Sequence, residues 1–243
     1  MAAQRGHKVS LYEETDVLGG QLRLAGKPPH KEEITYLVDT TERQLRDLGV
    51  SIHLNRTLDV EDVRGLKPDA VVVAAGAVTS VPPVEGIHAP HVLTAPEALR
   101  NPAALKGNVV VIGGGSTGAE TAEYLAVSGC KVAVVEMLKQ VAHDLENSRR
   151  RILLESLSKK GVRLLVGAKV KRITGSEVQM AWCGDEIALP ADYVVLSTGI
   201  RPRNDFENLR EKIGVPVYYA GSCANPGPGL EALREGFEVG CAV

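Results

Sequence analysis

The chain has few aromatic residues and no long apolar segment, and these absences exclude several classes of protein. Phe, Trp and Tyr make up 4% of its 243 residues, and no apolar run approaches the roughly 18 to 20 residues that a membrane-spanning helix needs. No secretory signal pattern is visible. The formal net charge is −2, and no run of Lys and Arg suggests a basic groove. We therefore expect neither nucleic acid nor a membrane as a partner.

The cysteines are few and widely separated. The four of them are Cys130, Cys183, Cys223 and Cys241, and no two form a C-x-x-C pair. This spacing argues against a disulfide-exchange centre, a zinc ribbon or a run of iron–sulfur ligands, and we expect no metal site. We expect four reduced, mostly buried thiols in a cytoplasmic protein.

Glycine, alanine and valine are plentiful in this sequence. There are 25 glycines, and a composition of this kind suits buried parallel sheets joined by tight turns between strands and helices. The length is sufficient for two modest domains. We predict an α/β fold with Rossmann-like, doubly wound parallel sheets.

One complete nucleotide-binding unit is visible. The apolar residues 109–112 lead into GGGSTG, residues 113–118, and then into a helical pattern. In this G-x-G-x-x-G turn, Gly113 permits the tight turn, Gly115 lets the backbone approach a pyrophosphate, and Gly118 lets the helix pack closely on the strand. The pyrophosphate is then expected against the amides of the helix N-terminus.

An acidic residue completes this unit. Glu136 follows Gly113 by 23 residues and ends a second apolar strand, where a carboxylate can bond the ribose hydroxyls. It suits a free 2′-hydroxyl and repels a 2′-phosphate, and the first nearby cation is Lys139, so NADH is favoured over NADPH. Within the turn, we interpret Ser116 and Thr117 as spacers whose hydroxyls can contact phosphate, and not as nucleophiles.

The second half of this unit is repeated near the start of the chain. Residues 6–13, GHKVSLYE, match residues 129–136, GCKVAVVE, in the pattern G-x-K-V-x-h-h-E, where h is apolar or aromatic. A glycine turn matching that at Gly113 would lie about ten residues before Met1. We therefore expect the chain to begin inside the first helix of another dinucleotide domain, without its first strand and turn. Residues 71–76, VVVAAG, and residues 193–199, YVVLSTG, are also similar, since each is an apolar run that ends in glycine.

The order of these motifs resembles one family of flavoproteins. The phrases LYEETDVLGGQLRLAGKPPHKEE, KPDAVVVAAGA, VVVIGGGSTGAETAEYLA and VVEMLKQVAHDL are similar to the C-terminal half of the family that includes 2,4-dienoyl-CoA reductase, 2-enoate reductases and trimethylamine dehydrogenase. The resemblance implies an FAD-binding domain made of residues 1–97 and 203–243, with an NAD(P)-binding domain, residues 98–202, inserted between them.

The resemblance also implies two sets of cofactor-binding residues. Those for FAD are Glu13 at the adenosine ribose, with Gly19, Gly20, Gln21, Ala75, Gly76, Gly221 and Ser222. Those for the nicotinamide nucleotide are Gly113, Gly115, Gly118, Glu120, Glu136, Thr198 and Gly199. Two positions depart from the family pattern, because Ala75 stands where Thr is usual and Ser222 where Asp is usual. The lost charge-assisted bond at Ser222 weakens the site by about 1 kcal/mol without abolishing it.

In whole members of the family, electrons pass from NAD(P)H to FAD, then to a 4Fe–4S cluster, and then to FMN in a barrel domain that reduces the substrate. The resemblance therefore implies an electron-input module, with no catalytic acid or base in this chain and with the barrel as its partner in cis or in trans. The expected substrate of the parent is an enoate or enoyl-CoA.

Two alternatives stay open at this point. The chain could be a non-catalytic module that holds ADP or NAD, or a fragment that needs a partner chain to supply the missing strand.

Overall fold

The computed structural model describes residues 1–203, 205–206 and 208–243, which form two compact units. The first unit comprises Met1–Arg23, Glu32–Val78 and Ile200–Val243, and the second comprises Leu24–Lys31 and Thr79–Gly199. The predicted domain limits, 97/98 and 202/203, stay a prediction. No helix in the described part of the chain is long and apolar enough to cross a membrane.

The second unit is built on a parallel sheet of five strands in the order β5-β12-β6-β7-β8. Its strands are β5 (Val92–Thr94), β6 (Asn108–Ile112), β7 (Lys131–Glu136), β8 (Arg163–Val166) and β12 (Tyr193–Leu196). The centre strand β6 is paired on both sides, with Val111 opposite Val134 on β7 and Val195 on β12. The predicted α/β fold with a Rossmann-like parallel sheet is confirmed.

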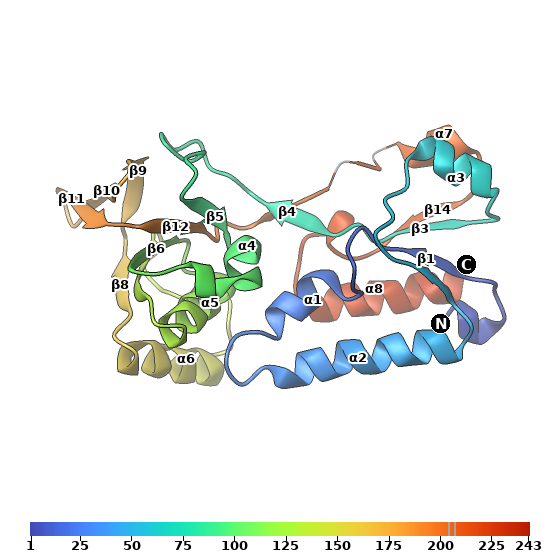
Figure 1. Cartoon of the computed structure of the whole chain (residues 1–243), viewed down its shortest axis with the longest axis horizontal. Helices are drawn as coiled ribbons and strands as arrows, with labels where there is room; N and C mark the ends of the chain where they lie inside the picture. The colour runs from blue at the N-terminus through green and yellow to red at the C-terminus, as the bar shows by residue number, and fades with distance from the viewer. Residues whose placement is uncertain (204, 207) are drawn as a thin grey trace. The chain divides into compact units, whose positions relative to one another are not determined.

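Both faces of this sheet are covered, as Figure 1 shows. One face carries α4 (Ala95–Arg100), α5 (Ser116–Val127) and α6 (Asn147–Lys159), and the other carries an antiparallel sheet of β9 (Lys169–Ile173), β10 (Glu177–Trp182) and β11 (Asp185–Pro190). Successive side chains of a strand point to opposite faces, so Val109 and Val111 pack with the helices while Val110 and Ile112 pack with β9–β11. This explains why β6 is apolar without alternation.

The first unit contains two separate pairs of parallel strands. The strands β1 (Ser10–Tyr12) and β2 (Ser51–His53) form one pair, and β3 (Val71–Val73) and β14 (Val217–Tyr219) form the other. Its helical elements are η1 (Ala3–Arg5), α1 (Gly20–Ala25), α2 (Glu32–Asp47), α3 (Val60–Leu66), α7 (Leu209–Ile213), η3 (Gly221–Cys223) and α8 (Gly229–Ala242). The segments that connect the two units contribute β4 (Ala77–Thr79) and β13 (Ile200–Pro202), which pair with each other.

The sequence repeat relates these pairs to the sheet of the second unit. By the repeat, β1 corresponds to β7, which pairs with β8, and β3 corresponds to β12, which pairs with β5. In the second unit β6 joins β7 to β12, whereas no strand among the described residues joins β1 to β3. The described residues of the first unit thus form the counterparts of the pairs β7–β8 and β12–β5, but no counterpart of the centre strand β6.

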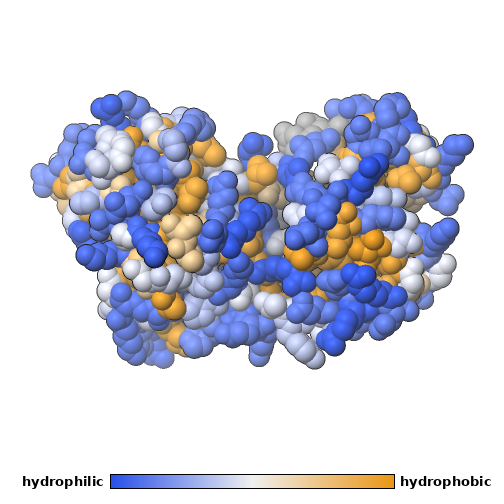
Figure 2. Space-filling model, viewed as in Figure 1, coloured by the Kyte–Doolittle hydropathy of each residue, from blue (hydrophilic) through white to orange (hydrophobic). Residues whose placement is uncertain are grey.

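Helix α8 of the first unit presents an apolar stripe to solvent. Leu230, Leu233 and Phe237 follow each other at helical spacing and are 78%, 48% and 56% exposed. Figure 2 shows apolar residues gathered on the surface over α8. An amphipathic helix normally buries such a stripe, so this face lacks the cover that α4 and α5 receive in the second unit.

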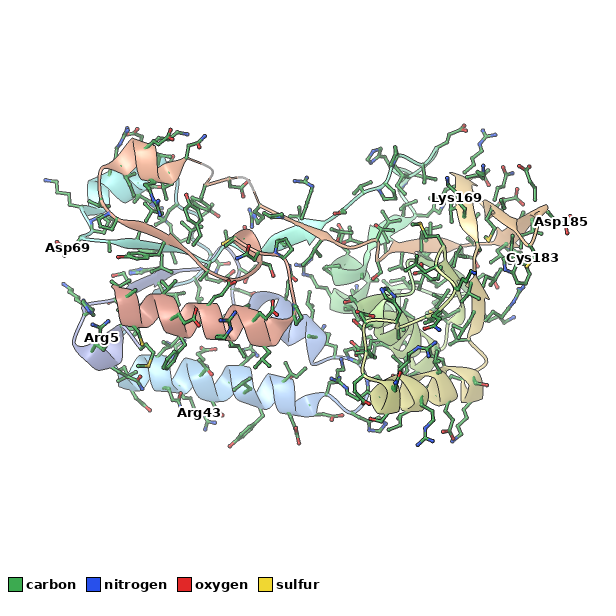
Figure 3. All side chains as sticks on the ribbon, turned by 180° about the vertical axis from the view of Figure 1, so that it is seen from behind. Arg5, Arg43, Asp69, Lys169, Cys183 and Asp185 are labelled. Carbon is green, nitrogen blue, oxygen red and sulfur yellow. The ribbon has the colours of Figure 1, made fainter. Side chains whose placement is uncertain are left out.

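The expectation that the thiols are mostly buried is wrong. Cys130 is buried and Cys223 is partly buried, but Cys183 and Cys241 are exposed. Cys183 lies at the tip of the β10–β11 hairpin (Figure 3), with a left-handed φ of 53°. Cys241 lies in the last turn of α8. No other helix or strand packs over a hairpin tip or a helix end, so a cysteine there stays exposed although its side chain is apolar.

Candidate functional site

At two positions of the glycine turn after β6, a Cβ would overlap a backbone carbonyl oxygen. Gly113 has a φ of 100°, and a Cβ there would overlap the carbonyl oxygen of Ser197. A Cβ on Gly118 would overlap the carbonyl oxygen of Gly113, because α5 packs directly against the end of β6. Gly115 differs, since it has an ordinary φ of −62° and lies at the N-cap of α5. The atoms nearest its Cβ position are the carboxylate oxygens of Asp144, at 3.8 and 3.9 Å. A Cβ at Gly115 therefore fits without overlap, and the side chain that borders it is the carboxylate of Asp144.

Glu136 lies at the end of β7, directly beside this turn. Its side chain is buried, with 6% of the residue exposed. One carboxylate oxygen accepts a hydrogen bond from the amide of Gly114 at 2.6 Å, and the other accepts one from the amide of Leu138 at 2.7 Å. The structure thus brings the predicted acid to the glycine turn and fixes it there.

The N-terminus of α5 is occupied by a carboxylate that the sequence patterns did not identify. The amide of Ser116 donates to one oxygen of Asp144 at 2.8 Å, and the Ser116 hydroxyl donates to the other at 2.6 Å. Partial desolvation raises the pKa of Asp144, but these bonds, with smaller contributions from its own backbone amide and from His143, outweigh it and hold the pKa below its ordinary value. Thr117 follows Ser116 in the first turn of the helix.

Glu120, one turn further along α5, forms an ion pair with Lys31. Both side chains are largely shielded from solvent, at 16% and 19% exposure. Lys31 was missed because 89 residues separate it from Glu120 in the sequence, and no local pattern links the two.

The Thr198–Gly199 turn at the end of β12 is tied to the segment that enters the second unit. The Thr198 hydroxyl donates to the carbonyl oxygen of Ser80 at 2.5 Å, and the amide of Ser80 donates to the carbonyl oxygen of Gly199 at 2.9 Å. Because β12 and β6 are neighbours, this turn and the glycine turn lie at the same edge of the sheet.

In the first unit, part of the residue set expected for FAD comes together. The side-chain amide of Gln21 donates to the carbonyl oxygen of Ala77 at 2.7 Å, and so lies beside the Ala75–Gly76 turn. Gly19 and Gly20 have positive φ values of 105° and 44°, and they form the turn that leads into α1.

The carboxylate of Glu13, at the end of β1, is satisfied locally. One of its oxygens accepts hydrogen bonds from both the amide and the hydroxyl of Thr15, each at 2.8 Å. The position at the strand end matches that of Glu136 in the second unit, but here no glycine turn in the described residues lies beside it.

The Gly221–Ser222 turn after β14 is held by α8. Gly221 has a φ of 72°, and its amide donates to a carboxylate oxygen of Glu235 at 2.7 Å. The other oxygen of Glu235 accepts from the side chain of Asn225 at 3.2 Å. Glu235 was also missed, since it lies within an ordinary amphipathic helix pattern.

The residues of the second unit fit a dinucleotide, because a glycine turn, a helix N-terminus and a buried acid meet at one sheet edge. Comparison with known proteins agrees with this geometry. Residues 1–224 match the family described as pyridine nucleotide-disulphide oxidoreductase. The chain belongs to this family. The family implies FAD and a nicotinamide nucleotide as cofactors, and the resemblance stated above is confirmed.

Individual relatives agree with the family assignment. The chain is 41% identical to the bilirubin reductase of Mediterraneibacter gnavus over 98% of this chain and 37% of that protein. It is 35% identical to the NADH oxidase of Thermoanaerobacter brockii over 98% of this chain and 38% of that protein. A solved structure of a 2-naphthoyl-CoA reductase with 2-naphthoyl-CoA superposes on all of this chain with a TM-score of 0.93, at 28% identity, and the match covers 37% of that chain. This chain therefore spans well under half the length of these relatives.

Proposed function

We propose that this chain is the electron-input part of a larger NAD(P)H-dependent flavoprotein oxidoreductase. The observation that carries the proposal is the complete strand, glycine turn and helix of the second unit, with Gly115 bordered by the exposed side chain of Asp144 and Glu136 fixed beside the turn. In this proposal the nucleotide pyrophosphate lies over Gly115, and the carboxylate of Glu136 bonds the adenosine ribose.

The side chains near Glu136 favour NADH over NADPH. The carboxylate would lie beside the 2′-position of the ribose and repel a phosphate there. The two residues that follow, Met137 and Leu138, are exposed and carry no charge. Lys139 is the first cation after the strand. This supports a site for an uncharged 2′-hydroxyl.

When bound, the nicotinamide supplies a hydride and the flavin accepts it. The residues of this chain bind and orient the cofactors, and the transfer requires no general acid or base from the protein. Gly113, Thr198 and Gly199 would border the nicotinamide nucleotide at the edge of the sheet. Glu120 would act from α5, where its ion pair with Lys31 fixes its position.

The FAD site is incomplete in the described residues. The strand and turn that correspond to β6 and Gly113–Gly118 would supply the amides for the FAD pyrophosphate, and neither is found between β1 and β3 in the part of the first unit that the structure describes. We therefore propose that this chain binds a nicotinamide nucleotide and binds FAD weakly or not at all. In the parent protein, electrons would pass onward through a 4Fe–4S cluster and FMN in a barrel domain, in cis or in trans, to an enoate or enoyl-CoA substrate. The 2-naphthoyl-CoA reductase carries an aromatic acyl-CoA thioester, and the similarity to it supports an acyl-CoA as the substrate.

Titration calorimetry tests the proposal directly. NADH, NADPH and FAD are each titrated into the purified chain, with the Glu136→Gln variant as a comparison. We expect NADH to bind more tightly than NADPH and FAD to bind more weakly than either. Absence of nucleotide binding would contradict the proposal, and submicromolar FAD binding would contradict the account of the incomplete site.

A second candidate function is a nucleotide-binding module that holds ADP or NAD without turnover. The glycine turn and Glu136 are compatible with it, because they would contact the pyrophosphate and the adenosine ribose, which ADP and NAD share. Flavin reduction by NADH in the complete parent protein distinguishes the two.

A further inference from the structure

The carboxylate of Asp144 lies where the proposed function requires an anionic ligand. Its two oxygens accept hydrogen bonds from the amide and the hydroxyl of the same residue, Ser116. Ser116 is the first residue of α5, where free amides and the helix dipole attract negative charge. The protein thus places its own anion on the helix N-terminus.

A bound pyrophosphate would meet this carboxylate. The carboxylate oxygens of Asp144 are the atoms nearest to the Cβ position of Gly115, at 3.8 and 3.9 Å. A phosphate and a carboxylate compete for the Ser116 amide, and they also repel each other at such short separation. The ligand therefore has to displace Asp144 or bind against its charge.

The segment that carries Asp144 is fixed, but Asp144 itself is not buried. Val141 and Ala142 pack into the core beneath α5. The amide of Ala142 donates to the carbonyl oxygen of Gly114 at 2.6 Å, and Arg150 donates to the carbonyl oxygen of Val141 at 2.8 Å. Asp144 is exposed, so its side chain can turn into solvent while this anchor stays in place.

We propose that Asp144 is an internal competitor of the nucleotide pyrophosphate, and that it sets the affinity of the site by occupying the N-terminus of α5 until the ligand displaces it. The proposal rests on the proposed function and adds a residue that determines affinity. It applies to ligands that carry phosphate at this position. Ligands without phosphate, such as adenosine, do not need the Ser116 amide.

The test compares Asp144→Asn with Asp192→Asn. The control is matched, because Asp192 is a carboxylate of the second unit whose oxygen accepts hydrogen bonds from the amide and side chain of Asn108, at 2.7 and 3.2 Å. Asn108 begins β6, so the control lies at the opposite end of that strand from the glycine turn. Both substitutions remove one negative charge, and each replaces a carboxylate that bonds a backbone amide.

ADP-ribose and adenosine are titrated into the full chain and into both variants at low salt. We expect Asp144→Asn to bind ADP-ribose about 3- to 10-fold more tightly than the unaltered chain, Asp192→Asn to stay within about twofold of it, and adenosine binding to change in neither. Asp144→Ser, a second neutral variant, should behave like Asp144→Asn, and circular dichroism verifies the fold of each.

The outcomes separate this inference from the proposed function. If the unaltered chain binds ADP-ribose and Asp144→Asn binds it equally or more weakly, Asp144 is not a competitor, while the nucleotide site stands. An equal gain for adenosine would also overturn the inference, since competition concerns the phosphate. If no form of the chain binds ADP-ribose, the inference and the nucleotide site both fail.

Discussion

Two alanine substitutions in the glycine turn separate folding from binding. At Gly118, the new methyl group would overlap the carbonyl oxygen of Gly113 and lie 3.2 Å from the Cβ of Ser197. Because the overlapping atom belongs to the backbone, α5 has to move away from β6, and overpacking of this kind costs about 1 to 3 kcal/mol or more. At Gly115, φ is −62° and no atom comes closer than 3.8 Å, so the cost is that of an alanine N-cap, about 1 kcal/mol or less.

Gly118→Ala should mainly lower the stability, whereas Gly115→Ala should mainly lower the affinity for the nucleotide. The methyl group of Gly115→Ala fills the space through which a pyrophosphate approaches the helix, so we expect NADH affinity to fall about tenfold or more in a protein of near-normal stability. Urea unfolding followed by fluorescence of Trp182, the one tryptophan of the chain, measures the stability, and calorimetry measures the affinity. The reasoning is refuted if Gly115→Ala proves the less stable variant, or if it binds NADH normally.

Three further predictions concern single side chains. Glu136→Gln keeps an acceptor for one of the two amides, that of Gly114 or that of Leu138, and removes the charge. The ratio of NADPH to NADH affinity should therefore rise about threefold or more in parallel titrations. Glu120→Gln removes the ionic partner of Lys31 and should lower the free energy of unfolding by up to about 1 kcal/mol in urea. Cys183 should react with a thiol reagent within the first phase of a labelling time course, whereas Cys130, whose thiol pKa is raised by burial, should react only when the chain unfolds.

A contradicting result can be named for each of the three side chains, Glu136, Glu120 and Cys130. An unchanged preference between the two nucleotides in Glu136→Gln would remove the argument for NADH. Glu155→Gln breaks the exposed ion pair with Lys159 on α6 and should leave stability unchanged, so an equal loss in both variants would contradict the role of burial at Glu120. Mass spectrometry identifies the labelled cysteines, and early labelling of Cys130 would contradict the packing of the second unit.

The parts of the structure that could be predicted are those written in consecutive residues. An uninterrupted apolar strand, a G-x-G-x-x-G turn and a strand-ending acid predicted β6, α5 and the location of Glu136. The repeat between residues 6–13 and 129–136 likewise predicted that β1 would correspond to β7. In these segments, backbone geometry and sheet burial leave little choice of residue type, and the pattern is therefore informative.

The contacts that could not be predicted join segments that are distant in sequence. Asp144 reaches Ser116 across 28 residues, and Glu235 reaches Gly221 from the middle of α8. In each case the partner is an ordinary carboxylate in a loop or on a helix, and only the tertiary fold brings it to a free backbone amide. The exposure of Cys183 was mispredicted for a related reason, since the whole fold determines which elements pack over a residue.

The most direct test of the central claim uses both cofactors in sequence. The chain is incubated anaerobically with FAD, excess flavin is removed, and NADH is then added while the flavin absorbance and the NADH fluorescence are recorded. We expect a colourless protein that still binds NADH, because the second unit has the whole nucleotide-binding turn, whereas the described residues of the first unit lack the strand and turn for the FAD pyrophosphate. A yellow protein whose colour bleaches with NADH would contradict the account of the first unit, and a protein that binds no NADH would contradict the central claim itself.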